Sequence, residues 1–232
     1  DINNNHSKVL VALKNKTGLE QRNFDQVLVS VGRIPNTNGL GLENTKVRLN
    51  NNGFIIADTK QKTDDPYISA IGDVVGGAML AHKASHEAKI AIEVLEGKNT
   101  SFNNRIMPAV IFTDPEIAWA GMTETQARIE GKEISIAKFP WVASGRAQSL
   151  GRGEGLTKLI IEPKTEKIIG IGLTGSGAGE LVSEGVLAIE IGIKAKDLAL
   201  SIHPHPTLSE TLMEAAEVFY GTATHIHKKK RT

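Results

Sequence analysis

The chain has 232 residues, 40% of them hydrophobic and 23% charged, which is enough apolar material for one or two globular domains. Its net charge of +1 argues against nucleic acid or an acidic membrane surface as the main partner. Without cysteine the chain has no disulfide, thiolate zinc site or cysteine nucleophile, and we predict neither a metal site nor a membrane span.

The first half of the chain predicts short strands followed by one helix. The opening DINNNHSK has no apolar signal segment and no Met, so we expect a piece of a longer protein. β-Branched runs predict two strands joined by a long polar turn, then a loop and two more strands. Apolar residues at helical spacing, ending on Gly97, predict the helix. These elements are strands 8–13, 26–32, 53–58 and 67–73, loop 33–45 and helix 82–97.

The second half predicts more strands with amphipathic helices between and after them. Thr123 and Gln126 form the sequence signature of a capping box, so a helix is expected to begin there. PKTE (163–166) predicts a hairpin turn. Strands grouped apart from helices indicate an α+β fold. The expected strands are 108–114, 117–121, 133–140, 155–162 and 167–175, and the expected helices are 123–131, 179–192 and 206–221.

The stretch AIGDVVGGAMLAHKA (70–84) places an acid between a predicted strand and a predicted helix. A carboxylate at Asp73 can accept a hydrogen bond from a sugar or polyol hydroxyl, and the N–H groups that open the helix favour negative charge. On periodicity alone, a plain turn with Asp73 as its turn-forming residue remains the stronger alternative. SVGR (30–33) also ends on a glycine, Gly32, which either admits a ligand to the backbone or simply ends a strand. The chain contains no complete GxGxxG fingerprint.

HPHPTLSE (203–210) joins two histidines to the start of a predicted helix. Pro206 suits the first helical position, so His205 is expected just before the helix. Glu210 lies one turn on and can reach back to His205, which is a base with an orienting carboxylate. The alternative, a turn histidine beside an acid that only favours the helix start, is equally weighted. His203 has no evident orienting partner, and His82 fits a surface position as well as a site.

Five stretches in order along the chain resemble the C-terminal half of the dihydrolipoamide dehydrogenases, a family of flavin disulfide oxidoreductases. They extend over nearly the whole chain. AIGD is shared with the wider group of flavoprotein disulfide reductases, whereas MLAHKA, FPWVASGRA and HPHPTLSE point to the lipoamide family. The stretches are VLVSVGRIPN, AIGDVVGGAMLAHKASHE, PAVIFTDPEIAWAGMTE, FPWVASGRA and HPHPTLSETLMEAAEVF.

The resemblance implies roles for individual residues. Asp73 would bind the ribityl chain of FAD, and Gly32 would contact NAD. His205 would be the acid/base for the dithiol, oriented by Glu210. A four-residue segment at the helix start would lie at the flavin pyrimidine edge, where the helix dipole favours the anionic reduced flavin. That segment comprises Met79, Leu80, Ala81 and His82.

The resemblance also implies domains and partners. Residues 1–35 would end an NAD-binding domain, 36–103 would be part of a central domain that contacts FAD, and 104–232 would be an interface domain. The expected architecture is thus an antiparallel sheet with helices on one side, preceded by a partial FAD/NAD-binding α/β region. The expected partners are a second copy of the chain and the lipoyl domain of a 2-oxo acid dehydrogenase or glycine cleavage complex. The compartment would be bacterial cytoplasm or mitochondrial matrix.

The chain departs from the family pattern by lacking GxGxxG and the redox-active CxxxxC. We therefore expect the isolated chain to be inactive and to bind no FAD or NAD by itself. Two alternatives stay open: another pyridine-nucleotide disulfide reductase, or a module that only dimerises.

Overall fold

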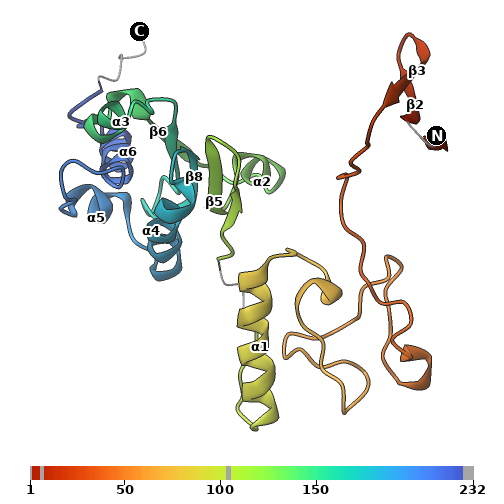
Figure 1. The fold of residues 1–232 in the computed structure, drawn as a ribbon. Helices are drawn as coiled ribbons and strands as arrows, with labels where there is room; N and C mark the ends of the chain where they lie inside the picture. Colours follow the sequence, from red (N-terminus) through yellow and green to blue (C-terminus); the bar gives the residue numbers. More distant parts are fainter. Residues whose placement is uncertain (1, 6–7, 103–105, 227–232) are drawn as a thin grey trace.

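A five-stranded antiparallel sheet with helices against it dominates the second half of the chain (Figure 1). The structure is a computed structural model that describes residues 2–5, 8–102 and 106–226. The strand order is β4-β5-β8-β7-β6, and every neighbouring pair is antiparallel. The strands are β4 (Ala109–Ile111), β5 (Glu116–Gly121), β6 (Ser135–Pro140), β7 (Leu156–Ile161) and β8 (Ile168–Gly175).

One face of this sheet is buried by helices. The paired residues Ala120, Ile171 and Leu159 are buried, whereas their neighbours Trp119, Gly172 and Lys158, which point to the opposite face, are only partly buried. α4 packs on β5 and β8, while α6 packs on β6 and β7. The expected antiparallel sheet with helices on one side is confirmed. The helical elements are α2 (Glu124–Ile129), η3 (Trp141–Ala143), α3 (Gly145–Leu150), α4 (Ala178–Ile191), α5 (Ala195–Leu200) and α6 (Glu210–Tyr220).

Local sequence signals explain several of these boundaries. The side chain of Thr123 accepts a hydrogen bond from the Gln126 amide, and the Gln126 side chain accepts one from the Thr123 amide, so the predicted capping box is present. The predicted hairpin joins β7 to β8. Two short helices, α3 and α5, were not predicted, because six residues are too few to show a helical period.

The predicted helix 206–221 starts later than its sequence indicated. α6 begins at Glu210 with Ser209 as its N-cap, and the His205–Pro206 peptide bond is cis. Pro206 is therefore not the first helical residue. His205 instead lies in an irregular loop ahead of the helix.

The central part of the chain is a loop-rich segment beside one long helix. Its elements are η1 (Leu42–Asn44), η2 (Gly72–Val75) and α1 (Ala81–Leu95), and Gly97 follows α1 in the left-handed conformation (φ 83°), as its sequence position predicted. A small core forms around Val47, Ile55 and Ala70. The predicted strands 53–58 and 67–73 are wrong, since only isolated bridges at Ile55 and Ser69 form there.

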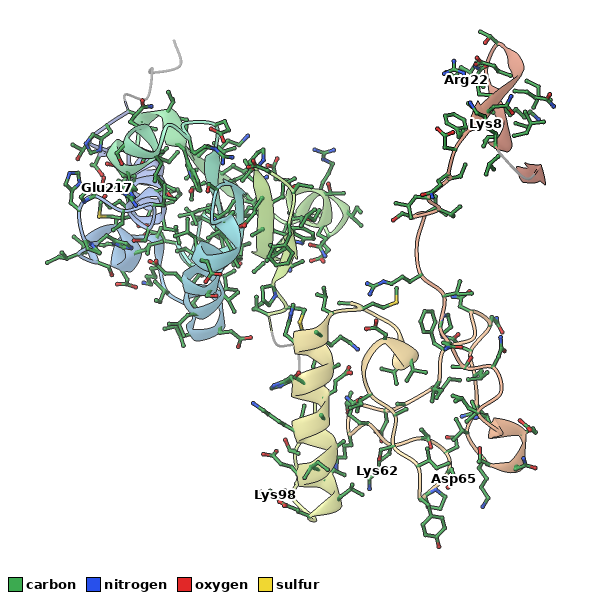
Figure 2. All side chains as sticks on the ribbon, viewed as in Figure 1. Lys8, Arg22, Lys62, Asp65, Lys98 and Glu217 are labelled. Carbon is green, nitrogen blue, oxygen red and sulfur yellow. The ribbon has the colours of Figure 1, made fainter. Side chains whose placement is uncertain are left out.

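The N-terminal residues form a separate three-stranded antiparallel sheet of β1 (Ile2–Asn5), β2 (Lys8–Asn15) and β3 (Gly18–Phe24). Figure 2 shows Lys8 and Arg22 on this sheet, away from the side chains of the rest of the chain. The predicted strand 8–13 is confirmed, but its partner is 18–24 after a short turn, and 26–32 is no strand. Leu28 and Val31 are about nine-tenths exposed, because no other strand lies beside this segment to pair with it. Among the described residues, no helix is long and apolar enough to cross a membrane.

Candidate functional site

The structure brings His205 and Glu210 into direct contact. The Nδ1 atom of His205 lies 2.9 Å from Oε1 of Glu210. A carboxylate can only accept, so Nδ1–H donates in the neutral ring and the Nε2 lone pair is left available to take a proton. His205 is 70% exposed at its side chain and Glu210 is 18% exposed, so the base is open to a substrate while its carboxylate partner is largely enclosed.

Glu210 is fixed by a second hydrogen bond. Its Oε2 accepts from the Thr207 amide at 2.7 Å. Burial raises the pKa of Glu210, but the hydrogen bonds from Thr207 and His205 outweigh burial, so the net pKa lies below its usual value. The carboxylate therefore stays ionised and holds the ring orientation of His205.

A chain of buried hydrogen bonds ties this loop to the sheet. The Nε1 atom of Trp141 donates to Oγ1 of Thr157 at 2.9 Å, and that hydroxyl donates to Oγ1 of Thr211 at 2.7 Å. Thr211 in turn donates to the carbonyl of Leu208 at 2.7 Å. The side chains of Trp141, Thr157 and Thr211, which form these hydrogen bonds, are fully buried. The first turn of α6, which carries Glu210, is thereby anchored to β7 and η3.

Two glycines make room for the ring of Trp141. A Cβ atom at Gly155 would lie 2.5 Å from Cδ2 of Trp141, and one at Gly175 would lie 2.2 Å from Cζ3. Only glycine lets the backbone at these two positions approach the indole this closely. The same region reaches the histidine, since a Cβ at Gly145 would lie 3.8 Å from Cε1 of His205. The stretch FPWVASGRA thus supports the loop that holds His205.

Two further histidine–carboxylate contacts are present that were not predicted from the sequence. His203 is nearly buried: its Nδ1 donates to the Ser201 carbonyl at 2.9 Å, and its Nε2 lies 2.8 Å from Oε1 of Glu184 on α4. The expectation that His203 has no orienting partner is therefore wrong. His225 contacts the buried Glu214 through Nδ1. Both partners are remote in sequence, so no local pattern reveals them.

A second group of expected site residues gathers between η2 and α1. Asp73 lies in η2 with its side chain 55% exposed, and Arg33 reaches it from the preceding loop at 3.3 Å. The other guanidinium nitrogen of Arg33 donates to the Met79 carbonyl at 2.7 Å. These residues border a cavity of about 340 Å³, which is also lined by Ile34, Pro35, Asn36 and Val74. Arg33 was not among the predicted site residues.

The helix start beside Asp73 has the expected character. Leu80 is the N-cap of α1 in extended conformation and offers no side-chain cap, so the first helical N–H groups, beginning at Ala81, lack an intrahelical partner. His82 donates from Nε2 to the Pro108 carbonyl at 2.8 Å, which links α1 to the residue just before β4. Gly32 stands next to Arg33 with φ 134°, a conformation that favours glycine, and a Cβ there would meet no atom within 4 Å.

Comparison with known protein families gives two matches that together cover most of the chain. Residues 1–88 match the model described as pyridine nucleotide-disulphide oxidoreductase. Residues 107–216 match the dimerisation domain of pyridine nucleotide-disulphide oxidoreductases. His205 and Glu210 lie within the second match, and Asp73 lies within the first.

Curated relatives and solved structures agree with these matches. Dihydrolipoyl dehydrogenase from Buchnera aphidicola (subsp. Acyrthosiphon pisum) is 50% identical over 203 residues, covering 88% of this chain and 43% of the relative. The Vibrio cholerae protein of that name is 44% identical over 223 residues, covering 96% of this chain and 47% of its own. The HOCl-induced flavoprotein disulfide reductase RclA from Escherichia coli superposes with a TM-score of 0.85 at 27% identity, over 94% of this chain and 49% of that one. LpdA from Mycobacterium tuberculosis superposes with a TM-score of 0.84 at 27% identity, over 93% of this chain and 47% of LpdA. The chain spans about half the length of the curated relatives it matches.

Proposed function

Since this chain belongs to the pyridine nucleotide-disulphide oxidoreductases, we propose that it is the C-terminal part of a dihydrolipoyl dehydrogenase. The whole protein would oxidise protein-bound dihydrolipoamide through a disulfide and FAD and pass a hydride to NAD⁺. The observation that carries this proposal is the His205–Glu210 contact at 2.9 Å, in a chain that shares 50% identity with a dihydrolipoyl dehydrogenase. Its partner would be the lipoyl domain of a 2-oxo acid dehydrogenase or glycine cleavage complex. The whole protein would work in the bacterial cytoplasm or the mitochondrial matrix.

His205 acts as the acid/base in this proposal. Its Nε2 takes a proton from one sulfur of the dithiol, which makes the thiolate that attacks a disulfide. Glu210 accepts from Nδ1–H and so keeps Nε2 available as the base. The chain has no cysteine of its own, so the disulfide has to come from outside the sequence described here.

The residues near Asp73 fit part of a flavin nucleotide. An exposed carboxylate suits the hydroxyls of a polyol chain, and the helix start of α1 offers unpaired N–H groups to an electron-rich ring edge. In this proposal Asp73 holds the ribityl chain, Met79, Leu80, Ala81 and His82 line the flavin edge, and Gly32 contacts NAD. FAD, when bound, would supply the redox chemistry between the dithiol and NAD⁺.

The domain division stays part of the proposal. Residues 1–35 would end the NAD-binding domain, 36–103 would be part of the central domain, and 104–232 would form the interface domain. The separate N-terminal sheet and the two separate hydrophobic cores support this division. The single match over residues 1–88 treats the first two parts together.

The roles of His205 and Glu210 are tested by substitution in the full-length protein. His205→Ala is expected to lower dithiol oxidation by about 10²–10⁴-fold, the usual contribution of an acid/base group. Electron transfer from NADH to an artificial acceptor needs no proton at the disulfide, so it should persist. Glu210→Gln should cost less, because its amide oxygen can still accept from Nδ1. Equal losses in both assays would contradict the assignment.

A dimer is the second expectation, supported by the match of residues 107–216 to a dimerisation domain. In the full-length protein the disulfide would lie in the part outside this sequence, and a symmetric pairing would bring that part of one subunit to His205 of the other. Light scattering of this chain should report twice its mass of 24.9 kDa at micromolar concentration. A monomer would mean that the contact needs the rest of the protein.

The alternative of another pyridine-nucleotide disulfide reductase has support from the structural similarity to RclA, whose TM-score is 0.85. The higher identity to dihydrolipoyl dehydrogenases, 43–50% in the relatives compared, against 27% for RclA, favours the lipoamide assignment. A panel of dithiol and disulfide substrates separates the two.

By itself, this chain would be an inactive dimerisation module that binds FAD poorly. Gel filtration of the chain mixed with FAD tests this, because bound FAD would keep the protein fraction yellow.

A further inference from the structure

A buried ion pair lies beside the Asp73 turn and has no part in the proposed proton chemistry. Nζ of Lys83 lies 2.7 Å from Oε1 of Glu87, one turn further along α1, and the side chains are only 9% and 4% exposed. Burying two charges is costly, and a well-packed apolar pair of similar volume is often as stable or more so. A contribution to folding stability is therefore a weak explanation for why both Lys83 and Glu87 are charged residues at this buried position.

The pair holds both polar backbone groups of Gly72. The second carboxylate oxygen of Glu87, Oε2, accepts from the Gly72 amide at 2.7 Å. Nζ of Lys83 reaches the Gly72 carbonyl at 3.5 Å. Gly72 has φ 75°, and a Cβ there would come within 3.1 Å of the Cβ of Ala84 on α1. The glycine is thus held in a left-handed conformation against the helix by two charged side chains of that helix.

Asp73 follows Gly72 directly, so holding the Gly72 backbone also fixes the position from which the Asp73 side chain extends. Without the pair, the N–H and C=O of Gly72 would be free to rotate, and Asp73 would lose its fixed position relative to the first turn of α1. A carboxylate and a helix start that act on one ligand need a constant separation. Figure 1 shows the η2 turn beside α1, in agreement with their contacts.

We propose that Lys83 and Glu87 form a positioning pair that locks Asp73 to the N-terminal turn of α1 and so sets the geometry of the flavin-binding edge. The flavin part rests on the proposed function. The backbone part rests only on the contacts of Gly72.

The backbone part is tested in this chain by hydrogen exchange of the Gly72 amide, with the Ile90 amide of α1 as internal reference. Glu87→Leu removes the acceptor and should speed Gly72 exchange at least about tenfold relative to Ile90, since the amide becomes locally free. Glu87→Gln keeps an acceptor oxygen and should stay within about threefold of the wild type. Because Glu87→Leu leaves Lys83 buried and unpaired, Lys83→Met with Glu87→Leu provides a variant with no unpaired charge that is expected to fold.

The flavin part is tested by FAD affinity of the full-length protein. The double variant Lys83→Met/Glu87→Leu should raise the FAD dissociation constant about 10–100-fold, the range found when a residue that orients a metal ligand is lost. Its melting temperature should stay close to that of the wild type, which separates positioning from stability. The matched control is Glu96→Gln with Lys98→Met, which removes an exposed ion pair just after the C-terminal end of α1. Figure 2 shows Lys98 at the far end of α1, and this control should leave FAD affinity unchanged.

The outcomes are distinct for the two claims. A double variant with wild-type Gly72 exchange overturns the backbone role, and one with wild-type FAD affinity overturns the positioning of the flavin edge. A full-length wild-type protein that binds no FAD overturns the proposed function, while the Gly72 measurement still decides the backbone role.

Discussion

Replacing Thr157 by Val tests the buried hydrogen-bond chain that anchors the His205 loop. Valine has nearly the same shape, but it removes the acceptor for Trp141 Nε1 and the donor to Thr211 Oγ1. A buried donor left without a partner costs about 1–3 kcal/mol, and the second lost bond costs about 0.5–1.5 kcal/mol. The added methyl returns about 0.8 kcal/mol of apolar burial. We expect the free energy of unfolding to fall by about 2 kcal/mol.

Urea denaturation followed by tryptophan fluorescence and by circular dichroism measures this change. Thr174→Val on β8 is the matched control, because Thr174 faces the side of the sheet that the helices do not cover, where it neighbours the partly exposed Ile117 in register. This control should change stability by less than about 0.5 kcal/mol. A loss below about 0.5 kcal/mol for Thr157→Val as well would refute the view that the hydroxyl chain fixes the start of α6.

Two further predictions concern packing and pH. Gly155→Ala should destabilise the chain by about 1–3 kcal/mol or more, because its Cβ would lie 2.5 Å from the Trp141 ring and 2.8 Å from the Thr174 carbonyl. In the same denaturation assay, Gly172→Ala, whose Cβ would meet only Cε of Lys158 at 3.5 Å, should stay within about 0.5 kcal/mol of the wild type. Partial burial, with the hydrogen bond to Glu166, raises the pKa of Tyr220 to about 12. Because the pKa is raised on folding, the stability it contributes is complete below about pH 10 and is lost as pH rises toward 12. Absorbance titration at alkaline pH should show a late tyrosine that Tyr220→Phe removes, and a titration unchanged by that substitution would contradict the shift.

The local patterns of this sequence predicted the elements whose partners lie close in the chain. The capping box at Thr123 and Gln126, the hairpin between β7 and β8, and the helix ending before Gly97 each depend on a few consecutive residues. The contact of His205 with Glu210 was accessible for the same reason, since five positions span one helical turn and a short loop. The catalytic roles of these two residues stay a prediction.

Strand predictions failed where the partner was absent or misplaced. The run 26–32 has strand composition, yet β structure requires hydrogen bonds to a neighbour, and the described part of the chain offers it none. Besides β1, β2 pairs with the polar and exposed segment 18–24, and a tight turn sets this pairing without any hydrophobic alternation. The runs 53–58 and 67–73 are irregular chain around a small core that buries Ile55 and Ala70, so part of their apolar pattern reflects burial without any strand pairing.

The sequence by itself determined the sheet-and-helix class of the second half and the family resemblance, and it made a contact of His205 with Glu210 one of two equally weighted alternatives, because these depend on residue types and short spacings. Only the tertiary structure decided the long-range contacts: Glu184 on His203, Arg33 on Asp73, and Glu87 on the Gly72 amide. Each joins residues 15 to 40 positions apart. No local propensity encodes such a contact, because it exists only after sheet, helix and loop have packed and brought the two groups within hydrogen-bonding distance.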